Sequence, residues 1–341
     1  MKTPIALLMS DLHINSDNIV EFNKNWKEAL EICHQKKIKE LVIGGDVFTS
    51  RASQTLWVLL AVKDALVMAT SQGLDVTLAN GNHCKPDAKS MYGYCHLYDT
   101  IEGVEVVNDY TILNFDTDFC LAVVSYFPEM NGFEKVLDDI KNHVKRLRYG
   151  IENTILYVHE GIHGGIGDFD VPGECPQEWF EGFMAVWAGH YHDPKRIKKT
   201  NIEYLGASKQ ATFGESEVKG YTILYSDGSK EFVQNEVNTR YRTVEADYDD
   251  DLQLDDDPRY KTRLKLNCTD AQAKTVDKEK LHAMGFNKIE LKTEKVKATE
   301  VKETDLDQRF DKQGIKKEYK RFCNTKEIEP DLGLKYLDKL N

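Results

Sequence analysis

The sequence predicts an α/β sandwich in which helices cover the outer faces of the sheets. Over the first 240 residues, short apolar runs alternate with longer segments of helical periodicity. Most of the short polar motifs in this region follow directly on one of these runs, as expected where ligands bind beyond the carboxyl ends of strands. A length of 341 residues and an apolar content of 41% allow one large domain and a smaller one.

The expected elements alternate along this first region. Helices are expected at residues 22–37, 53–71 and 131–148; the first carries Trp26, Leu30 and Cys33 at helical spacing. Strands are expected at residues 5–9, 41–43, 74–78, 104–107, 111–115, 119–126, 154–158, 184–188, 202–206, 220–225 and 231–234.

The remainder of the chain divides into further segments after a core domain at 1–245. An acidic, poorly apolar stretch at 246–260 that contains Pro258 reads as a linker. A strand–helix–strand pattern predicts a small cap domain at 261–300, and 301–341 is expected to be helical. The helical spacing in this last segment rests on Leu306, Phe310, Ile315, Tyr319 and Phe322, followed by Leu332, Leu334, Leu337 and Leu340.

The seven cysteines are odd in number, scattered, and form no C-x-x-C pair, which is typical of reduced intracellular thiols. The N-terminus lacks the features of a signal peptide, and no apolar run is long enough to cross a bilayer. We therefore expect a cytoplasmic protein that does not associate with membranes.

Five polar motifs occur in a fixed order along the first two-thirds of the chain. They are Asp11-Leu-His13, Gly45-Asp46, Gly81-Asn82-His83, His159 and Gly189-His190-Tyr-His192. Each motif by itself is weak evidence for a functional site; a lone histidine, for example, more often has a structural role than a metal-binding one. Together they supply two aspartates, an asparagine and four histidines as candidate ligands, and one further histidine for proton transfer. This inventory suits two divalent cations that share a bridging carboxylate, an arrangement that cleaves phosphate esters.

Local geometry supports shared ligation within the motifs. Side chains two residues apart point to the same side of an extended chain, so Asp11 and His13 can chelate one cation together. The same alternation lets His190 and His192 face the site, one toward each metal. Mixed oxygen and imidazole ligands suit Mn²⁺, Fe²⁺ or Zn²⁺ better than Mg²⁺ or Ca²⁺.

This motif series resembles the calcineurin-like metallophosphoesterase superfamily, over residues 5 to about 235. The resemblance implies a four-layer α-β-β-α sandwich with a small C-terminal α+β cap domain and terminal helices. It also implies two divalent cations, for which we expect Mn²⁺, and gives His83 the role of proton donor to the leaving oxygen. By the same resemblance the first metal is held by Asp11, His13, Asp46 and His192, and the second by the bridging Asp46 with Asn82, His159 and His190.

Further segments resemble the SbcD-type nucleases of DNA repair and recombination. These are Gly45-Asp46-Val-Phe48 with the leucine-rich helix after it, Tyr204-Leu-Gly206-Ala-Ser208, Phe213-Gly214-Glu215 and Lys219-Gly220. The length with a short cap looks most like the bacteriophage-type recombination endonuclease subunit, which would place the protein in a host cytoplasm. The resemblance implies hydrolysis of DNA phosphodiesters in double-strand-break repair, and docking of terminal helices on an SbcC-like, Rad-type coiled-coil ATPase.

Several positions depart from the family pattern. Cys84 stands where Asp often follows Gly-Asn-His; it either alters the surroundings of His83 or simply packs beneath the site. Asn15, Thr49 and Ala207 also differ, and none of them is expected to touch a predicted ligand. His163 could replace His159 as a ligand, but we favour His159 because it ends an apolar run.

DNA backbone contacts are expected from the basic cluster directly after the last metal motif, Lys195, Arg196, Lys198 and Lys199. A second candidate is the basic helix at 131–148, and either cluster can instead be an ordinary solvated face. The net charge of −12 is unusual for a DNA-binding protein. Two bound dications would offset about four of these charges locally, and seven aspartates are segregated between Asp247 and Asp257.

Several assignments stay open at the level of sequence. The C-terminal apolar positions either dock on the ATPase or complete the core of the cap domain. A set of apolar and aromatic side chains either forms a homodimer face, as in the resembled family, or belongs to the core: Trp57, Leu59, Leu60, Tyr92, Tyr94 and Tyr98. A small-molecule or nucleotide phosphoesterase would share every predicted metal ligand, and a non-catalytic scaffold on the same fold is a third candidate.

Overall fold

The structure is a computed structural model that describes residues 2–87, 90, 92–127, 130–167, 171–254, 257–293, 312–325 and 329–339. The chain divides into two compact units. The first comprises Met1–Val244, Gln253–Leu264 and Leu281–Lys288, and the second comprises Glu245–Leu252, Lys265–Lys280 and Ile289–Asn341.

The first sheet of the larger unit has six strands in the order β12-β11-β1-β2-β3-β4. Its strands β1 to β4 run parallel to one another, whereas β11 is antiparallel to β1 and β12 is antiparallel to β11. The bounds are β1 Pro4–Met9, β2 Glu40–Ile43, β3 Asp75–Ala79, β4 Val104–Val107, β11 Gly220–Tyr225 and β12 Lys230–Gln234.

The second sheet also has six strands, in the order β5-β6-β7-β8-β10-β9. The inner strands β6, β7, β8 and β10 are parallel, and the two edge strands are antiparallel to their neighbours. The bounds are β5 Tyr110–Asn114, β6 Cys120–Val124, β7 Thr154–Val158, β8 Ala185–Ala188, β9 Lys195–Arg196 and β10 Ile202–Tyr204.

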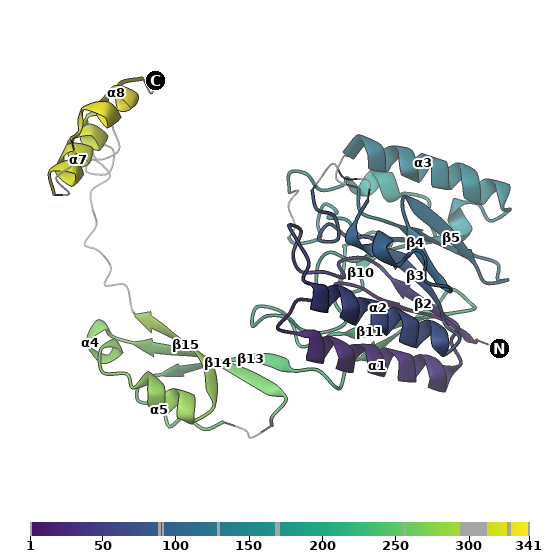
Figure 1. The fold of residues 1–341 in the computed structure, drawn as a ribbon, viewed down its shortest axis with the longest axis horizontal. Coiled ribbons are helices and arrows are strands. Elements are labelled where there is room, and N and C mark those ends of the chain that lie inside the picture. Colours follow the sequence, from purple (N-terminus) through teal and green to yellow (C-terminus); the bar gives the residue numbers. More distant parts are fainter. Residues whose placement is uncertain are drawn as a thin grey trace. The chain divides into compact units, whose positions relative to one another are not determined.

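Helices cover the outer faces of the two sheets. Helices α1 (Ile19–Lys36) and α2 (Leu56–Ser71) lie along one side, and α3 (Met130–Arg146) lies along the opposite side (Figure 1). Short 3₁₀ helices occur at Tyr94–Tyr98, Ile151–Asn153 and Gln177–Phe180.

Three apolar cores hold these four layers together. Along β1, Leu7 and Met9 pack in the core beneath α1 and α2, whereas Ala6 and Leu8 pack in the core between the two sheets. This alternation follows from the two-residue period of a strand, and it explains why β1 is apolar on both faces. A third core joins α3 to the second sheet, with Phe133 and Ile140 fully buried. The predicted α-β-β-α sandwich is therefore confirmed.

Helix boundaries differ from the sequence prediction for local reasons. Helix α2 begins at Leu56, not at residue 53, because the Thr55 hydroxyl accepts a hydrogen bond from Val58 N and caps the helix. Helix α1 begins at Ile19, three residues before the predicted start, because the apolar spacing that marked it becomes regular only from Phe22.

A third sheet follows, with three strands in the order β13-β14-β15. Its bounds are β13 Arg240–Asp247, β14 Tyr260–Cys268 and β15 Phe286–Thr293, and the short helices α4 Asp270–Ala273 and α5 Lys278–Ala283 connect the last two strands. Strand β13 was not predicted, because none of its residues is fully buried and its sequence has no apolar run. The predicted acidic linker at 246–260 overlaps the end of β13 and the first residue of β14.

Two helices, α7 (Lys312–Thr325) and α8 (Asp331–Lys339), occupy the C-terminal segment. Phe322 and Ile315 on α7 are exposed, whereas Cys323 is buried. The predicted helical positions Leu306, Phe310 and Leu340 lie outside the described residues. Across the described parts of the chain, no helix combines the length and the apolar character needed to cross a bilayer.

The aromatic and apolar set around α2 is divided between core and surface. Tyr98 is buried and its hydroxyl donates to the Leu59 carbonyl oxygen, so this pair belongs to the core. Trp57 and Tyr92 are 71% and 67% exposed, and Leu60 is partly exposed beside Trp57.

Candidate metal centre

The five polar motifs meet because each follows the carboxyl end of a parallel strand. Asp11 and His13 follow β1, Asp46 follows β2, and Asn82 follows β3 in the first sheet. In the second sheet, His159 follows β7 directly, and the His190 and His192 pair follows β8. Parallel strands end at the same edge of a sheet, and the two stacked sheets therefore bring all five motifs together.

Backbone hydrogen bonds hold the first two motif loops side by side. Asp11 N donates to Gly45 O at 3.1 Å, and His13 N donates to Asp46 O at 3.0 Å. Gly81 must lack a side chain because a Cβ there would clash with Asp46, and a Cβ at Gly45 would clash with the His159 ring. The glycines of these motifs thus permit the close approach of three loops.

Four of the candidate ligands have a left-handed backbone conformation, so the extended backbone expected at Asp11, His13 and His190 was wrong. The φ angles are 55° at Asp11, 43° at His13, 47° at Asp46 and 86° at His190. Residues with side chains rarely adopt this conformation, and it is often retained at functional sites. The strain is maintained here by the surrounding loop hydrogen bonds and points to a functional arrangement of these side chains.

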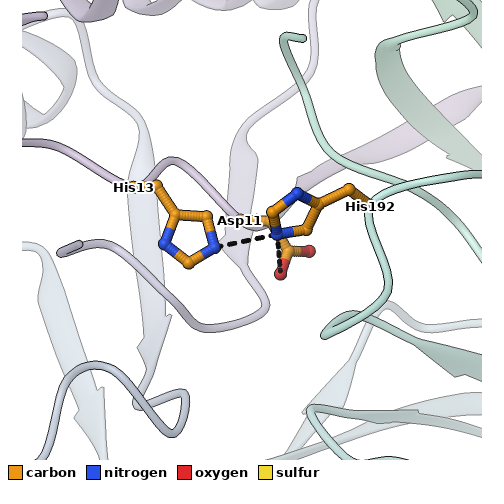
Figure 2. A group of neighbouring side chains, drawn as sticks. All are labelled: Asp11, His13 and His192. Carbon is orange, nitrogen blue, oxygen red and sulfur yellow. Dashed lines mark hydrogen bonds and ion pairs between the residues drawn. The ribbon is translucent and has the colours of Figure 1, made fainter. Parts of the chain in front are cut away.

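One group of potential ligands comprises Asp11, His13 and His192, whose ligand atoms lie within 4.8 Å of one another. Figure 2 shows the two imidazole rings facing each other, with the Asp11 carboxylate beside His192. The Nε2 atoms of His13 and His192 are 3.0 Å apart, and His192 Nε2 is 4.0 Å from Asp11 Oδ1.

A second group comprises Asp46, His159 and His190, again within 4.8 Å. His159 Nε2 lies 3.2 Å from Asp46 Oδ2, and its Nδ1 bonds to Gly44 O at 2.8 Å. The Asn82 amide lies 3.1 Å from both Asp46 Oδ2 and His190 Nδ1.

Asp46 lies between the two groups. Its Oδ2 atom is 3.2 Å from His159 Nε2 in its own group and 3.6 Å from His13 Nε2 in the other. Its second oxygen, Oδ1, accepts a hydrogen bond from His83 N at 2.8 Å, which fixes the carboxylate plane. The structure therefore brings together all seven residues predicted as ligands.

The donor set fits divalent cations. Buried carboxylate oxygens, imidazole nitrogens and the Asn82 amide group converge at the site. Buried carboxylates require compensating positive charge, which divalent cations would supply. When the amide is turned, its nitrogen donates to Asp46 and its oxygen accepts from Arg51.

A proton compensates part of the negative charge. Burial disfavours a charged imidazole, but the carboxylates of Asp46 and Asp11 raise the pKa of His159 to about 10. Burial also opposes ionisation of Asp46, but the neighbouring His159 holds the pKa of Asp46 well below its usual range. Burial, together with the nearby His159 charge, lowers the pKa of His190 to about 4. A bound dication would replace the His159 proton.

This proton gives a testable pH dependence. The pKa of His159 is about 10 in the folded protein, whereas the ordinary pKa of a histidine is 6.5. A raised folded-state pKa contributes stability that is fully present below pH 6.5 and lost as the pH rises through 10. We expect the free energy of unfolding of metal-free protein to fall across this window, measured by urea titration in EDTA. In His159→Gln, the free energy of unfolding should fall less steeply with pH over this window. An equally steep fall in that variant would contradict the assignment of the raised pKa to His159.

His83 lies apart from both ligand groups but lines the same cleft. Its Nδ1 atom is 2.6 Å from the Thr49 carbonyl oxygen, and its ring makes an edge contact with His13 at 5.0 Å. Because a carbonyl oxygen can only accept, Nδ1 carries a proton and Nε2 is the atom left for substrate.

Sequence reasoning missed several supporting residues. Glu215 Oε1 lies 3.2 Å from His192 Nδ1 and orients that ring. Ser10 Oγ donates to Asp11 Oδ2 at 2.6 Å. The expectation that Thr49 and Ala207 touch no predicted ligand was wrong, because the Thr49 hydroxyl donates to His13 O at 2.6 Å and Ala207 N donates to His192 O at 2.9 Å. The Thr49 carbonyl oxygen also accepts a hydrogen bond from His83 Nδ1. Of these residues, only Glu215 could have been found from the sequence, because it belongs to the Phe-Gly-Glu segment.

The two open questions near the motifs have structural answers. Cys84 is fully buried and its sulfur accepts a hydrogen bond from Val47 N, so it packs beneath the Asp46 loop. His163 belongs to neither ligand group found among the described residues, whereas His159 is fully buried within one of them.

The basic cluster predicted for DNA lies on and after β9. The Lys195 ammonium donates to the carbonyl oxygens of Gly164 and Gly165, at 2.9 and 2.8 Å. Arg196 donates to Thr200 O, whereas Lys198 and Lys199 are exposed. Contact of these four side chains with DNA stays a prediction.

Comparisons with known proteins agree with the resemblance seen in the motifs. No protein-family model matches the chain. The chain is 23% identical over 247 residues to the SbcD component of the SbcCD nuclease of Staphylococcus saprophyticus, a match that spans 62% of either chain. The expected resemblance to an SbcD-type nuclease is thus confirmed as a similarity of sequence.

Solved structures of phosphoesterases and nucleases are also similar to this chain. A dimetal phosphatase from Danio rerio matches with a TM-score of 0.44 and 10% identity, covering 65% of this chain and 93% of that one. The nuclease MPE of Pseudomonas putida matches with a TM-score of 0.28 and 16% identity, covering 55% of this chain and 62% of that one.

Proposed function

We propose that this chain is a two-metal DNA nuclease of the calcineurin-like metallophosphoesterase superfamily. The observation that carries the proposal is the pair of ligand groups that meet at Asp46 within one cleft. The similarity to the SbcD component of an SbcCD nuclease supports the nuclease assignment over other phosphoesterases.

The ligand roles follow the two groups. Asp11, His13, Asp46 and His192 would hold one cation, and the bridging Asp46 with Asn82, His159 and His190 would hold the other. Two divalent cations, which we propose to be Mn²⁺, would supply charge stabilisation for the phosphate and activation of the attacking water. The mixed oxygen and nitrogen ligands favour such a cation over Ca²⁺ or Mg²⁺.

The protein's own contribution is positioning and proton transfer. Glu215 and the Gly44 carbonyl oxygen orient His192 and His159, so that each ring presents Nε2 to the site. His83, with Nδ1 held by Thr49 O, presents Nε2 toward the cleft as the proton donor to the departing sugar oxygen. The expected products are a phosphate monoester and a free sugar hydroxyl.

The wider role proposed is double-strand-break repair and recombination in the cytoplasm, together with an SbcC-like, Rad-type coiled-coil ATPase. Helices α7 and α8 are the proposed docking segment, since Phe322 and Ile315 expose apolar surface on α7. Copurification of such an ATPase with the wild-type chain, and its loss in Phe322→Glu, would support this. Equal copurification with both chains would contradict it.

A matched pair of substrates tests the nuclease activity. Purified protein with Mn²⁺ is expected to degrade linear duplex or single-stranded DNA, and EDTA should stop the reaction. Rapid hydrolysis of bis(p-nitrophenyl) phosphate without cleavage of DNA would instead favour a small-molecule phosphoesterase. Inactivity on both substrates with Mn²⁺, Fe²⁺ and Zn²⁺ would favour a non-catalytic scaffold.

A homodimer is proposed through the exposed surface of α2. Trp57 and Leu56 are largely exposed beside Leu60, and burial of such apolar area stabilises association. We expect sedimentation equilibrium to give a dimer for the wild-type chain and a monomer for Trp57→Lys. Lys63→Gln, which changes an exposed residue of the same helix, serves as the control. A dimer of unchanged affinity in Trp57→Lys would contradict the proposed face.

A further inference from the structure

The cleft that contains the metal centre extends well beyond it. Its volume is about 560 Å³, within the range of pockets that bind ligands larger than a single phosphate. His83 and His190 line the cleft beside the ligand groups, and Lys209, Gln210 and Tyr241 also line it. Neither the predicted metal ligands nor the proton donor accounts for these latter residues.

Lys209 is an unusual residue within this cleft. Its side chain is only 5% exposed, and within the described chain it makes no hydrogen bond or ion pair. The other buried lysines are paired: Lys85 donates to Tyr126 O at 2.8 Å, and Lys219 donates to Asp193 Oδ1 at 2.7 Å. A buried ammonium without a partner costs free energy, and burial accordingly lowers the pKa of Lys209.

The backbone on both sides of Lys209 is firmly held. Ser208 Oγ donates to Asn25 Oδ1 on α1 at 2.9 Å. Gln210 accepts from Tyr241 N at 2.7 Å and donates to Glu215 O at 2.9 Å. Glu215 in turn orients His192, so Lys209 is anchored to the same framework as the metal centre. Such anchoring reduces the entropy lost when the ammonium binds an anion.

Glu215 and Glu21 lie near enough to Lys209 to oppose the effect of burial on its pKa, but neither carboxylate forms an ion pair with it. Glu21 also lines the cleft, but its Oε2 atom accepts from Asn238 Nδ2 and Thr239 N, both at 2.9 Å. Its Oε1 atom pairs with Lys24 at 3.0 Å. Glu215 is engaged by His192 and Lys219. The ammonium of Lys209 is therefore a positive charge available to an anionic ligand in the cleft.

We infer that Lys209 binds a second phosphate of the substrate, one that neighbours the phosphate undergoing cleavage. The inference rests on the proposed nuclease function and deepens it, because it makes the cleft selective for a polynucleotide over a lone phosphodiester. An ammonium binds phosphate as a compact point charge. A repeating phosphate backbone presents such an anion beside every scissile bond.

A pair of dinucleotides isolates this contact. Both are p-nitrophenyl esters with a 5′ fluorophore; one has an ordinary internucleotide phosphodiester and the other an uncharged methylphosphonate. KM with Mn²⁺ is read from nitrophenolate release, and Kd is read from fluorescence anisotropy with Mn²⁺ and again in EDTA. Wild-type protein is expected to prefer the charged ligand by about tenfold or more, as for a hydrogen bond between charged groups.

Substitution of Lys209 should remove the preference. Lys209→Met and Lys209→Gln should bind both dinucleotides equally, Lys209→Arg should retain part of the preference, and Lys63→Gln on α2 should match wild type. The slope of log Kd against log salt for the charged ligand should fall by about 0.7 in Lys209→Met. Thermal melting identifies any variant that does not fold. The variants that do fold then test whether the preference depends on Lys209.

The outcomes separate the inference from the proposed function. An undiminished preference in a folded Lys209→Met, or an equal loss of affinity for both ligands, would overturn the inference. If the protein hydrolyses neither dinucleotide, but its Kd values still show a preference for the charged ligand that depends on Lys209, the inference is supported and the nuclease proposal is removed. Failure of the wild-type protein to distinguish or bind the two ligands would overturn the inference as well.

Discussion

Replacing His83 with asparagine is expected to slow phosphodiester cleavage by about 10²–10⁴-fold, the usual contribution of a general acid. The change leaves both ligand groups intact, because His83 belongs to neither of them. The backbone N–H of residue 83 can still donate to Asp46 Oδ1, so the carboxylate keeps its orientation. The rate is measured on single-stranded DNA with Mn²⁺, and metal content by equilibrium dialysis.

His34→Asn, at an exposed position on α1, is the matched control and should cleave at the wild-type rate. If His83→Asn also cleaves at that rate, the proton-donor role is wrong. If it instead loses a cation, His83 is a metal ligand, and the assignment of the ligand groups must change.

Replacing Asp46 with asparagine is expected to abolish cleavage and to reduce cation binding at both sites. Asp46 Oδ2 lies 3.2 Å from His159 Nε2 and 3.6 Å from His13 Nε2, so one carboxylate serves both groups. Asparagine keeps an oxygen that can accept from His83 N and has nearly the same volume. The fold should persist while one negative charge between the two cations is lost.

Calorimetric titration with Mn²⁺ measures this effect, and Asp64→Asn on α2 is the control for removal of an exposed carboxylate. Wild type and the control should bind two cations with equal affinity. Titration of Asp46→Asn with unchanged stoichiometry and affinity would rule out the bridging role.

The arrangement of strands and helices was largely predictable from apolar periodicity. Strands such as β1 and β7 are buried on both faces and therefore read as continuous apolar runs. Strand β13 escaped prediction because its residues are only partly buried and its partners come from later in the chain. Periodicity reports burial, so a strand without a buried face leaves little signal.

The candidate site was predictable in its ligand types but not in its supporting contacts. Asp11, Asp46 and His159 stand in short motifs after strands, where residue type and position reveal a possible ligand. Thr49 acts through its carbonyl oxygen on His83, an atom that every residue carries, so no motif marks it. Lys209 is distinguished only by burial without a partner, which a sequence does not report.

The sequence by itself determined the α/β class and the inventory of seven candidate ligands, because both depend on residue type and local order. Tertiary structure alone decided that these side chains divide into two groups joined at Asp46, and that Lys209 opens into the same cleft. Such distances arise from the stacking of two sheets whose strands lie far apart in the chain. Local periodicity carries no information about that stacking.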